Sequence, residues 1–372
     1  MNIVIGSGLS AISAYKKHNC DLMIGKGIIG GTASSTNNKK FLFDKGIHVL
    51  NTIPENGIGC NCNNYKRKAK IINKIGEIID YPYQKNNTDN PINETPKNYL
   101  DYIIKRFGDK DARDFHVPYN DKFWKYPLHK MSADWANTKY VPKKNINGSY
   151  GTNDNFWYPS KGYIGNIAEK RYNSLNLQHN HDNVVAFDIK DKTIITNNNK
   201  YKYNKCYSSI PLNRINIDWG CCKKYIKRLK HTTIACFNFS IHNNNIKKSF
   251  EGLHWIYFCS KEIPFIRISF PSNYGGKTLK GYTTIQCEIS INPYDKLKNY
   301  HDYAQIMKDI GIFKKIPTFI SSEIINIAYC IPTLTVNEDV KKITQYLNKY
   351  DIFPIGRYGK WKNLWMHEVM NI

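Results

Sequence analysis

The chain has 372 residues, an apolar fraction of 41% and a formal net charge of +24, which suffices for two or three packed domains and excludes an intrinsically disordered chain. The positive excess is nearly all Lys, is scattered and accompanies many Asn and Ile residues, so we expect no nucleic-acid partner despite the charge. Because no apolar run reaches the ~18 residues of a membrane span and no signal peptide precedes the first predicted strand, we expect a cytoplasmic protein without a membrane partner.

The ten cysteines show no paired zinc-ligand spacing. Cys60 and Cys62, with the adjacent Cys221 and Cys222, are the only close pairs. Reduced thiols and no metal site are therefore expected. A basic surface favours an anionic substrate by electrostatic steering.

A nucleotide-binding motif opens the chain. Residues 2–5 predict a strand, Gly6-Ser7-Gly8-Leu9-Ser10-Ala11 follows, and a helical pattern continues to about residue 18. This is a G-x-G-x-x-A motif between strand and helix, where the glycines permit the turn and the approach of a pyrophosphate, and the alanine permits close packing. We therefore expect Gly6, Ser7, Gly8 and Ala11 to bind a dinucleotide. A plain strand–turn–helix is the alternative.

The second predicted strand, residues 21–24, should end in an acidic residue that binds the ribose, but Gly25-Lys26 stands there. Further along, Gly30 and Gly31 form a pair that is typical of flavin rather than nicotinamide proteins, because it lets the backbone pass close to the cofactor. The run 43–48 then ends in His48. Taken alone, His48 could equally be a strand-end histidine without a ligand.

The later elements are predicted from periodicity and turn residues. Residues 98–107 form an amphipathic helical pattern. Residues 184–189 and 193–196 predict a hairpin, and 206–210 a strand that returns to the first domain. β-rich segments at 231–241, 254–259, 265–270 and 283–289 predict a sheet domain, after which the last ~40 residues rejoin the first domain.

Several ordered segments resemble the UDP-galactopyranose mutases, a family of FAD enzymes, and in particular their eukaryotic type. The resemblance begins with residues 30–48 and spans nearly the whole chain. The other matching segments are 81–86 (YPYQKN), 118–124 (PYNDKFW), Trp135, 153–162, Trp255 with Tyr257, 264–274 and 356–362 (GRYGKWK).

The resemblance implies an α/β fold with an FAD-binding Rossmann-like domain, an inserted helical domain and an antiparallel sheet domain. The FAD-binding domain is then discontinuous, with residues 1–75, 169–227 and 333–372. Residues 76–168 form the helical substrate domain, and residues 228–332 form the sheet that roofs the substrate.

The resemblance also implies an isomerase that interconverts UDP-galactopyranose and UDP-galactofuranose, in which N5 of reduced FAD attacks the anomeric carbon. The partner is then a UDP-sugar, and NAD(P)H is one candidate reductant. The sequence leaves the oligomeric state open.

The residues that match the family's functional positions fall into three groups. His48 and Arg267 are the expected catalytic residues, and Arg is scarce in this Lys-rich chain, which favours a need for its bidentate fork. Gly30, Gly31, His48, Arg357 and Trp361 are expected to bind the cofactor. The expected substrate-binding residues are Gln84, Asn120, Trp124, Lys139, Trp255, Tyr257, Arg267, Tyr274 and Tyr329. For each aromatic residue, core packing is the alternative, and for Arg267 a structural ion pair.

Three departures leave the substrate open. Lys139 stands where the family has a second diphosphate-binding Arg, Asn363 replaces a Tyr, and the run ending in His367-Glu368 does not match. Two other functions therefore remain: a flavin oxidoreductase of the amine-oxidase or protoporphyrinogen-oxidase type, and a binding protein whose flavin site has decayed.

Overall fold

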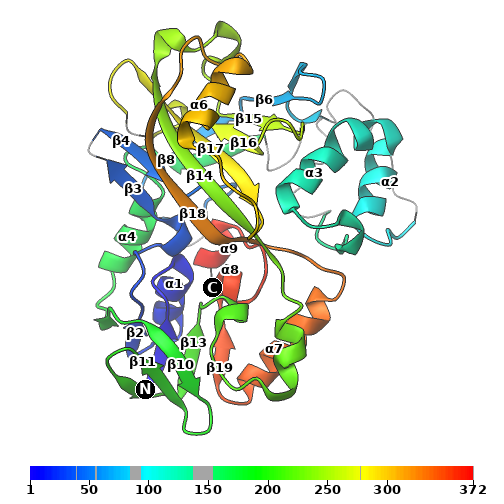
Figure 1. The fold of residues 1–372 in the computed structure, drawn as a ribbon. Coiled ribbons are helices and arrows are strands. Elements are labelled where there is room, and N and C mark those ends of the chain that lie inside the picture. Colours follow the sequence, from blue (N-terminus) through cyan, green and yellow to red (C-terminus); the bar gives the residue numbers. More distant parts are fainter. Residues whose placement is uncertain (39, 55–56, 84–93, 137–153, 277, 372) are drawn as a thin grey trace.

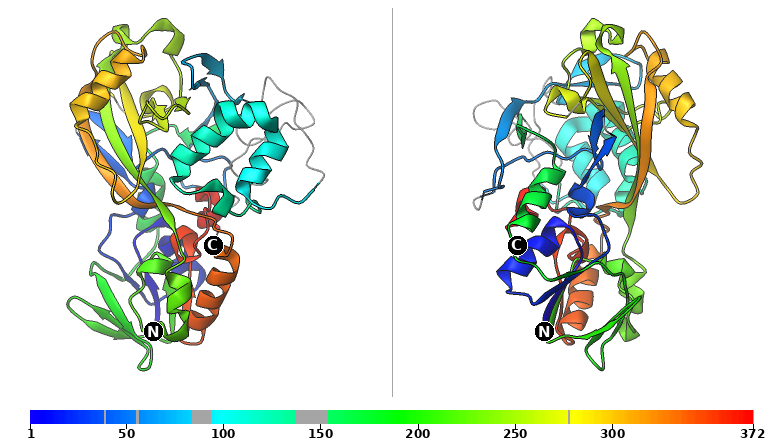
Figure 2. Two further views of the ribbon diagram at one scale, coloured as in Figure 1. Left: turned by 45° about the vertical axis from the view of Figure 1, so that its right-hand side comes forward. Right: turned by 90° about the vertical axis from the view of Figure 1, so that its left-hand side faces the viewer.

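The computed structural model describes residues 1–372 except 39, 55–56, 84–93, 137–153, 277 and 372. The described elements form a lower sheet, an upper sheet and a pair of helices beside the upper one (Figure 1). The N-terminus lies in the lower part, and the C-terminal helices lie between the two sheets (Figure 2).

The lower sheet has five parallel strands in the order β19-β13-β1-β2-β9. Distant segments of the chain supply them: β1 (Asn2–Ile5), β2 (Leu22–Ile24), β9 (His179–Asn180), β13 (Lys205–Ser208) and β19 (Ile352–Pro354). Strands covered on both faces are expected to be continuously apolar, and Ile3, Val4 and Ile5 are at most 2% exposed. Their carboxyl ends meet at the edge where such sheets bind ligands.

Short helices cover the lower sheet. α1 (Leu9–Lys17) follows β1, buries Ala11 and Ile12, and ends with two lysines that suit the negative end of its dipole. The remaining helices of this layer are α4 (Gly165–Asn173), α5 (Lys223–Ile226), α7 (Val336–Asn348), α8 (Gly356–Gly359) and α9 (Met366–Met370).

A three-stranded antiparallel sheet extends the lower layer with β10 (Val184–Asp188), β11 (Thr193–Thr196) and β12 (Lys200–Lys202). The predicted hairpin is thereby confirmed. The predicted return of the last ~40 residues is confirmed as well, because β19 pairs with β13.

The upper sheet has seven strands in the order β18-β14-β17-β16-β15-β6-β7. They are β6 (Ala69–Ile72), β7 (Ile78–Asp80), β14 (His231–His242), β15 (Trp255–Phe258), β16 (Arg267–Ser269), β17 (Tyr282–Ile291) and β18 (Thr318–Cys330). All four predicted β-rich segments are present, whereas β18 was not predicted. The predicted boundary at residue 75 falls between β6 and β7, which pair with each other.

α6 (Tyr300–Asp309) packs against the upper sheet, and a capping box between Asn299 and Asp302 fixes its first turn. Two ribbons connect the layers: β3 (Ser35–Asn38) with β4 (Phe41–Asp44), and β5 (Cys62–Lys66) with β8 (Asn155–Pro159). The domain limits given above stay a prediction.

The helical pair consists of α2 (Tyr99–Asp111) and α3 (Val117–Trp124), joined by one π-helical turn at Ala112–His116. Asn98 caps α2 by accepting a hydrogen bond from the backbone N–H of Asp101 at 3.0 Å. The predicted amphipathic face is buried, with Tyr102 and Ile103 fully enclosed. Over the described residues, every helix is too short or too polar to cross a lipid bilayer.

Candidate functional site

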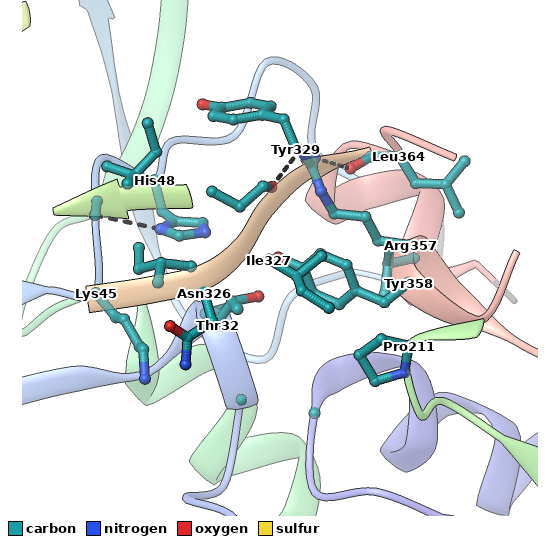
Figure 3. Close-up of a pocket in the computed structure, with 18 of the residues that line it drawn as sticks. Thr32, Lys45, His48, Pro211, Asn326, Ile327, Tyr329, Arg357, Tyr358 and Leu364 are labelled. Carbon is teal, nitrogen blue, oxygen red and sulfur yellow. Dashed lines mark hydrogen bonds between the residues drawn. The ribbon is translucent and has the colours of Figure 1, made fainter. Parts of the chain in front are cut away.

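A pocket of about 950 Å³ lies between the two sheets. Its floor is made by the loops that follow β1, β2 and β13, and its roof by β15–β18 of the upper sheet. α3 and the π-helical turn form one side wall, and α8 with the segment before α9 closes the pocket near the C-terminus (Figure 3).

The predicted nucleotide motif forms a narrow backbone cradle in the floor. Gly6 has φ +116°, and a Cβ at this position would lie 2.0 Å from Ser209 Oγ, so only glycine fits. Gly8 forms a parallel bridge with Gly30, and a Cβ on Gly31 would lie 3.2 Å from the Gly8 Cα. The N-terminus of α1 opens into this cradle without a side-chain cap. Unpaired N–H groups on such a surface suit a pyrophosphate.

Gly25 cannot be replaced by an acidic residue in this loop. A Cβ there would lie 2.6 Å from Ser7 Oγ and 2.9 Å from the Gly6 carbonyl carbon, and Ser7 Oγ donates to Gly25 O at 3.1 Å. The carboxylate that lines this end of the pocket belongs to Asp182, just after β9. It accepts hydrogen bonds from the backbone N–H of Asn183 and Asn198 at 2.7 and 3.1 Å, so it organises the loop.

His48 points into the pocket from the loop after β4 (Figure 3). Burial lowers the pKa of its imidazole to about 4, although the hydrogen bond to Gly46 opposes this shift. The ring is therefore neutral at pH 7. Its Nδ1 lies 3.3 Å from the Gly46 carbonyl, which can only accept a hydrogen bond. Nδ1 thus carries the proton, and Nε2 is left as an acceptor.

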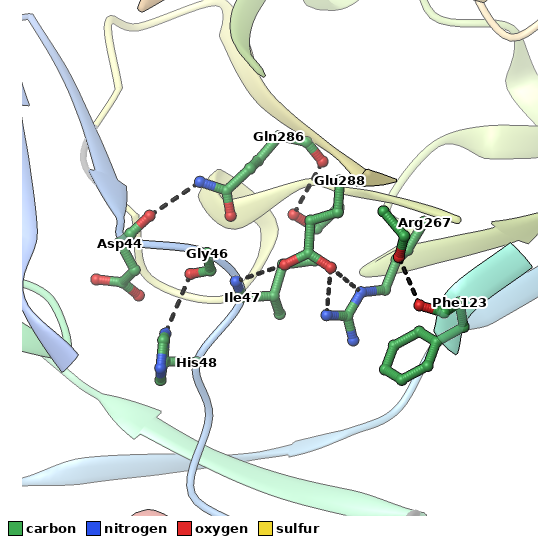
Figure 4. Close-up of polar contacts among 10 residues, drawn as sticks. Asp44, Gly46, Ile47, His48, Phe123, Arg267, Gln286 and Glu288 are labelled. Carbon is green, nitrogen blue, oxygen red and sulfur yellow. Dashed lines mark hydrogen bonds and ion pairs between the residues drawn. The ribbon is translucent and has the colours of Figure 1, made fainter. Parts of the chain in front are cut away.

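Arg267 and Glu288 form a buried ion pair on neighbouring strands (Figure 4). Arg267 Nε and Nη2 lie 3.0 and 2.5 Å from Glu288 Oε2. The other carboxylate oxygen, Oε1, accepts a hydrogen bond from the Ile47 N–H at 3.0 Å. Glu288 therefore ties the predicted catalytic arginine to the loop that carries His48. The ion pair considered as the alternative for Arg267 is present, and Arg267 also lines the pocket, so its substrate-binding role stays a prediction.

Asp44 anchors the start of the same loop (Figure 4). It accepts hydrogen bonds from Ser35 Oγ at 2.5 Å, Tyr158 Oη at 2.7 Å and the Ile164 N–H at 3.2 Å. Burial raises the pKa of this carboxyl group to about 6, against the opposing effect of these hydrogen bonds. The Gln286 amide donates to the Asp44 carbonyl at 2.9 Å, so both ends of the loop are held by β17.

Arginine is concentrated around the pocket. Four of the eight arginines line it, namely Arg67, Arg214, Arg267 and Arg357. Arg67, whose guanidinium lies 4.6 Å from the centroid of the Trp255 ring, was not among the residues predicted for the site. The scarcity of Arg among many Lys residues was a signal that could have identified it.

Arg357 and Asn363 form a hydrogen-bond network near the C-terminus. Arg357 donates to the carbonyls of Leu364 and Ala328 at 3.0 and 3.1 Å and to Asn363 Oδ1 at 3.1 Å. Asn363 Nδ2 donates to the Cys330 carbonyl at 2.8 Å, and its Oδ1 accepts from the Cys330 N–H at 3.0 Å. The residue that departs from the family pattern thus binds β18 to α8 and orients Arg357.

The predicted substrate residues divide into three groups. Asn120, Trp124, Trp255, Tyr257, Arg267 and Tyr329 line the pocket. Tyr274 does not, because it lies behind Trp255, with ring centroids 5.5 Å apart. Gln84 and Lys139 fall outside the described residues.

Most of the predicted cofactor residues line the pocket: Gly6, Ser7, Gly8, Gly30, Gly31, His48 and Arg357. Ala11 and Trp361 do not line it; they pack in the core and are 0% and 4% exposed. In the structure Ala11 is buried in α1 and Trp361 packs in the core after α8, and their cofactor-binding roles stay a prediction.

The residues present fit a dinucleotide. At Gly8, an added Cβ would project into the cradle, with Gly30 O at 3.8 Å and the Gly31 Cα at 4.0 Å as its nearest neighbours. The pocket continues past this cradle to His48 and Arg267, which leaves room for a second ligand. In the part of the chain that the structure describes, no three His, Cys, Asp or Glu side chains are grouped to hold a metal.

No protein-family model matches the chain. The chain does resemble solved structures over nearly its whole length. The crystal structure of reduced UDP-galactopyranose mutase aligns with a TM-score of 0.85 and 19% identity, covering 99% of this chain and 92% of that one. A CLA-producing fatty acid isomerase from P. acnes aligns with a TM-score of 0.65 and 12% identity, covering 95% and 92%.

Cyclohexylamine oxidase from Brevibacterium oxydans aligns with a TM-score of 0.62 and 12% identity, covering 90% and 89%. At these identities, the likeness concerns the fold. Since one fold serves several chemistries, the activity must be argued from the pocket. The chain has the mixed α/β fold of flavin-dependent enzymes and resembles UDP-galactopyranose mutase over its full length.

Proposed function

We propose that this chain is an FAD-dependent sugar-nucleotide mutase that interconverts UDP-galactopyranose and UDP-galactofuranose. The observation that carries the proposal is the buried Arg267–Glu288 pair beside His48, in the same pocket as the glycine cradle. An arginine fixed in this way offers a preset partner for a diphosphate. The full-length likeness to the mutase supports the same conclusion.

The glycine cradle and the N-terminus of α1 would hold the FAD pyrophosphate, while His48 and Arg357 would lie against the flavin. Bound in its reduced form, FAD supplies N5 as the nucleophile for the anomeric carbon. The neutral His48 keeps Nε2 as a hydrogen-bond acceptor in this region.

Arg267 would bind the departing and returning UDP, and so keep it within reach of the sugar. Glu288 fixes the direction of the guanidinium. The hydroxyls of Tyr119 and Tyr329 stay protonated, because burial raises the pKa of both, so they donate hydrogen bonds without adding charge.

The alternative is a flavin oxidoreductase of the amine-oxidase type, which the likeness to cyclohexylamine oxidase supports. It requires no diphosphate-binding groups. The four arginines around the pocket therefore favour the mutase.

The test is to load the protein with FAD, reduce it with dithionite and incubate it with UDP-galactofuranose, followed by chromatography. We expect conversion to UDP-galactopyranose, and we expect Arg267→Lys to lose most of it because a point charge replaces the fork. Exposed Arg113→Lys is the matched control. Retained flavin without conversion, together with oxygen consumption on amines, would reject the mutase in favour of the oxidase.

A further inference from the structure

Cys60 and Cys62 form a pair of accessible thiols away from the pocket. Neither residue lines the pocket, and both are half-buried, so part of each residue meets solvent. Of the other eight cysteines, seven are buried, and burial raises the pKa of each of these seven thiols. A thiol reacts as its thiolate, so the seven buried thiols react slowly at neutral pH.

The backbone holds the two side chains of the pair close together. The chain bends at residues 59–60 and enters β5 at Cys62. Between the cysteines, the Asn61 carbonyl accepts hydrogen bonds from the Ser160 N–H and Oγ at 2.9 and 3.1 Å. Cys62 itself is the register partner of Pro159 in β8. This anchored turn brings the two thiols into a side-chain hydrogen bond.

The two thiols differ in acidity. The hydrogen bond with Cys62, assisted by the positive charge of Lys170, lowers the pKa of Cys60 to about 7, although partial burial opposes this shift. The same hydrogen bond raises the pKa of Cys62, because the thiol that donates keeps its proton. Lys170 belongs to α4, which packs against this turn: a Cβ on Gly59 would lie 3.9 Å from the Lys170 Cβ. One thiol is therefore a nucleophile at neutral pH, and its neighbour is a protonated thiol in reserve.

The other close pair of cysteines lacks this arrangement. Cys221 is exposed, but Cys222 is buried, and its Sγ donates to the Lys342 carbonyl at 3.9 Å. A second accessible thiol is thus present beside Cys60 and absent beside Cys221.

We propose that Cys60 and Cys62 form a thiol–disulfide exchange site, which reacts with small-molecule disulfides and closes to an intramolecular Cys60–Cys62 disulfide. This inference goes beyond the proposed function and does not depend on it. Cys60 is the attacking thiol and Cys62 the resolving thiol.

The exchange has two steps. The Cys60 thiolate attacks one sulfur of a disulfide RSSR, so that a Cys60–SR bond forms, the RS–SR bond breaks and RS⁻ leaves. Cys60 then no longer carries the negative charge that kept Cys62 protonated, so Cys62 ionises and attacks Cys60 Sγ. The second RS⁻ leaves. The two protein thiols lose two electrons and two protons, and RSSR becomes two RSH.

The test incubates the full-length protein with glutathione disulfide at pH 7 and locates its disulfides by mass spectrometry of peptides. Wild-type protein is compared with Cys221→Ser, which removes the exposed thiol and serves as the parent of the other variants. We expect a Cys60–Cys62 crosslink in both proteins, without a lasting glutathione adduct on either residue. Dithiothreitol should reopen this crosslink.

The serine variants separate the two roles. Cys62→Ser should accumulate a lasting mixed disulfide on Cys60, because the resolving thiol is missing. Cys60→Ser should react about threefold or more slowly than the parent, because the remaining thiol has lost its acidic neighbour and its lower thiolate fraction outweighs its greater nucleophilicity.

Three results would overturn the inference. The first is wild-type protein that leaves both cysteines unmodified. The second is a glutathione adduct that persists on wild-type Cys60 without a crosslink, because the pair then does not close. The third is a Cys60→Ser variant that reacts as fast as the parent, because Cys60 is then not the attacking thiol. Should a serine variant fail to fold, the crosslink or adduct in wild-type protein decides.

Discussion

Arg267 donates two hydrogen bonds to one oxygen of Glu288, and the other oxygen of that carboxylate holds the backbone of the loop that carries His48. A single acidic side chain thus links the predicted diphosphate-binding residue to the predicted flavin-contacting residue. The Glu288 side chain is buried at 5% exposed, and the Arg267 side chain is largely enclosed at 17%. The pair therefore has a structural role as well as the proposed functional one, and variants can separate the two.

Arg267→Met leaves Glu288 as an uncompensated buried charge, so we expect a loss of about 3–5 kcal/mol of unfolding free energy. The double variant Arg267→Met/Glu288→Gln removes both charges and should recover most of that loss. It should not recover UDP binding, since the guanidinium is gone. Urea denaturation and UDP calorimetry on the three proteins give both quantities. A double variant that regains UDP affinity would contradict the role of Arg267 in diphosphate binding.

Asn363 replaces a tyrosine of the family pattern, and in the structure it hydrogen-bonds to Cys330 and Arg357. Asn363→Ala removes its hydrogen bonds to Cys330 and Arg357, so we expect a stability loss of about 1–3 kcal/mol in urea denaturation. Exposed Asn337→Ala is the control and should lie within about 0.5 kcal/mol of wild type. Equal stability of Asn363→Ala and wild type would show that the Asn363 hydrogen bonds do not stabilise the fold.

Local patterns made much of the fold predictable. The motif from Gly6 to Ala11 could be interpreted because a strand, a turn and a helix N-terminus are adjacent in the chain, so the sequence holds the whole geometry. The hairpin of β10 and β11 was predictable for the same reason. In both cases, neighbours in sequence are also neighbours in space.

Contacts between strands that are distant in the chain made other parts of the site unpredictable from the sequence. Glu288 meets Arg267 only because β16 and β17 pair in one particular register, which periodicity does not specify. Glu288 is the one charged residue of the 282–291 strand, and this was the available signal.

The pH dependence of stability should reveal the buried Asp44. Its pKa rises from 3.8 in the unfolded chain to about 6 in the folded one. The folded state therefore binds the extra proton between these values, and stability falls as pH rises from about 4 to 6. A shift of about two units corresponds to a loss on the order of 3 kcal/mol, complete above about pH 6.

Asp44→Asn removes this titration and keeps the contacts, because the amide oxygen accepts from Ser35 and Ile164 and the amide nitrogen donates to the Tyr158 oxygen. Relative to wild type, the variant should gain stability as pH rises from about 4 to 6. Urea denaturation at several pH values measures this difference, with exposed Asp309→Asn as control. A difference that does not vary with pH would show that Asp44 does not titrate in this range.

Gly8 distinguishes a glycine required by a ligand from one required by the fold. Its φ of −81° and ψ of 170° suit any residue, and an added Cβ makes only ordinary contacts. Gly8→Val should therefore fold normally, but its methyl groups would occupy the cradle. We expect FAD affinity to fall about a hundredfold or more, measured as flavin retained on gel filtration and by titration of the apoprotein.

Gly6→Ala, on the same loop, should impair folding, whereas Gly8→Val should impair FAD binding. Gly6 has φ +116°, and the new Cβ would lie 2.0 Å from Ser209 Oγ, so we expect the apoprotein itself to lose about 1–3 kcal/mol of stability. Gly8→Ala, the smaller change, should lie between Gly8→Val and wild type in FAD affinity. If Gly8→Val binds FAD as wild type does, then the pyrophosphate does not lie against the N-terminus of α1, and the cradle is only a tight turn.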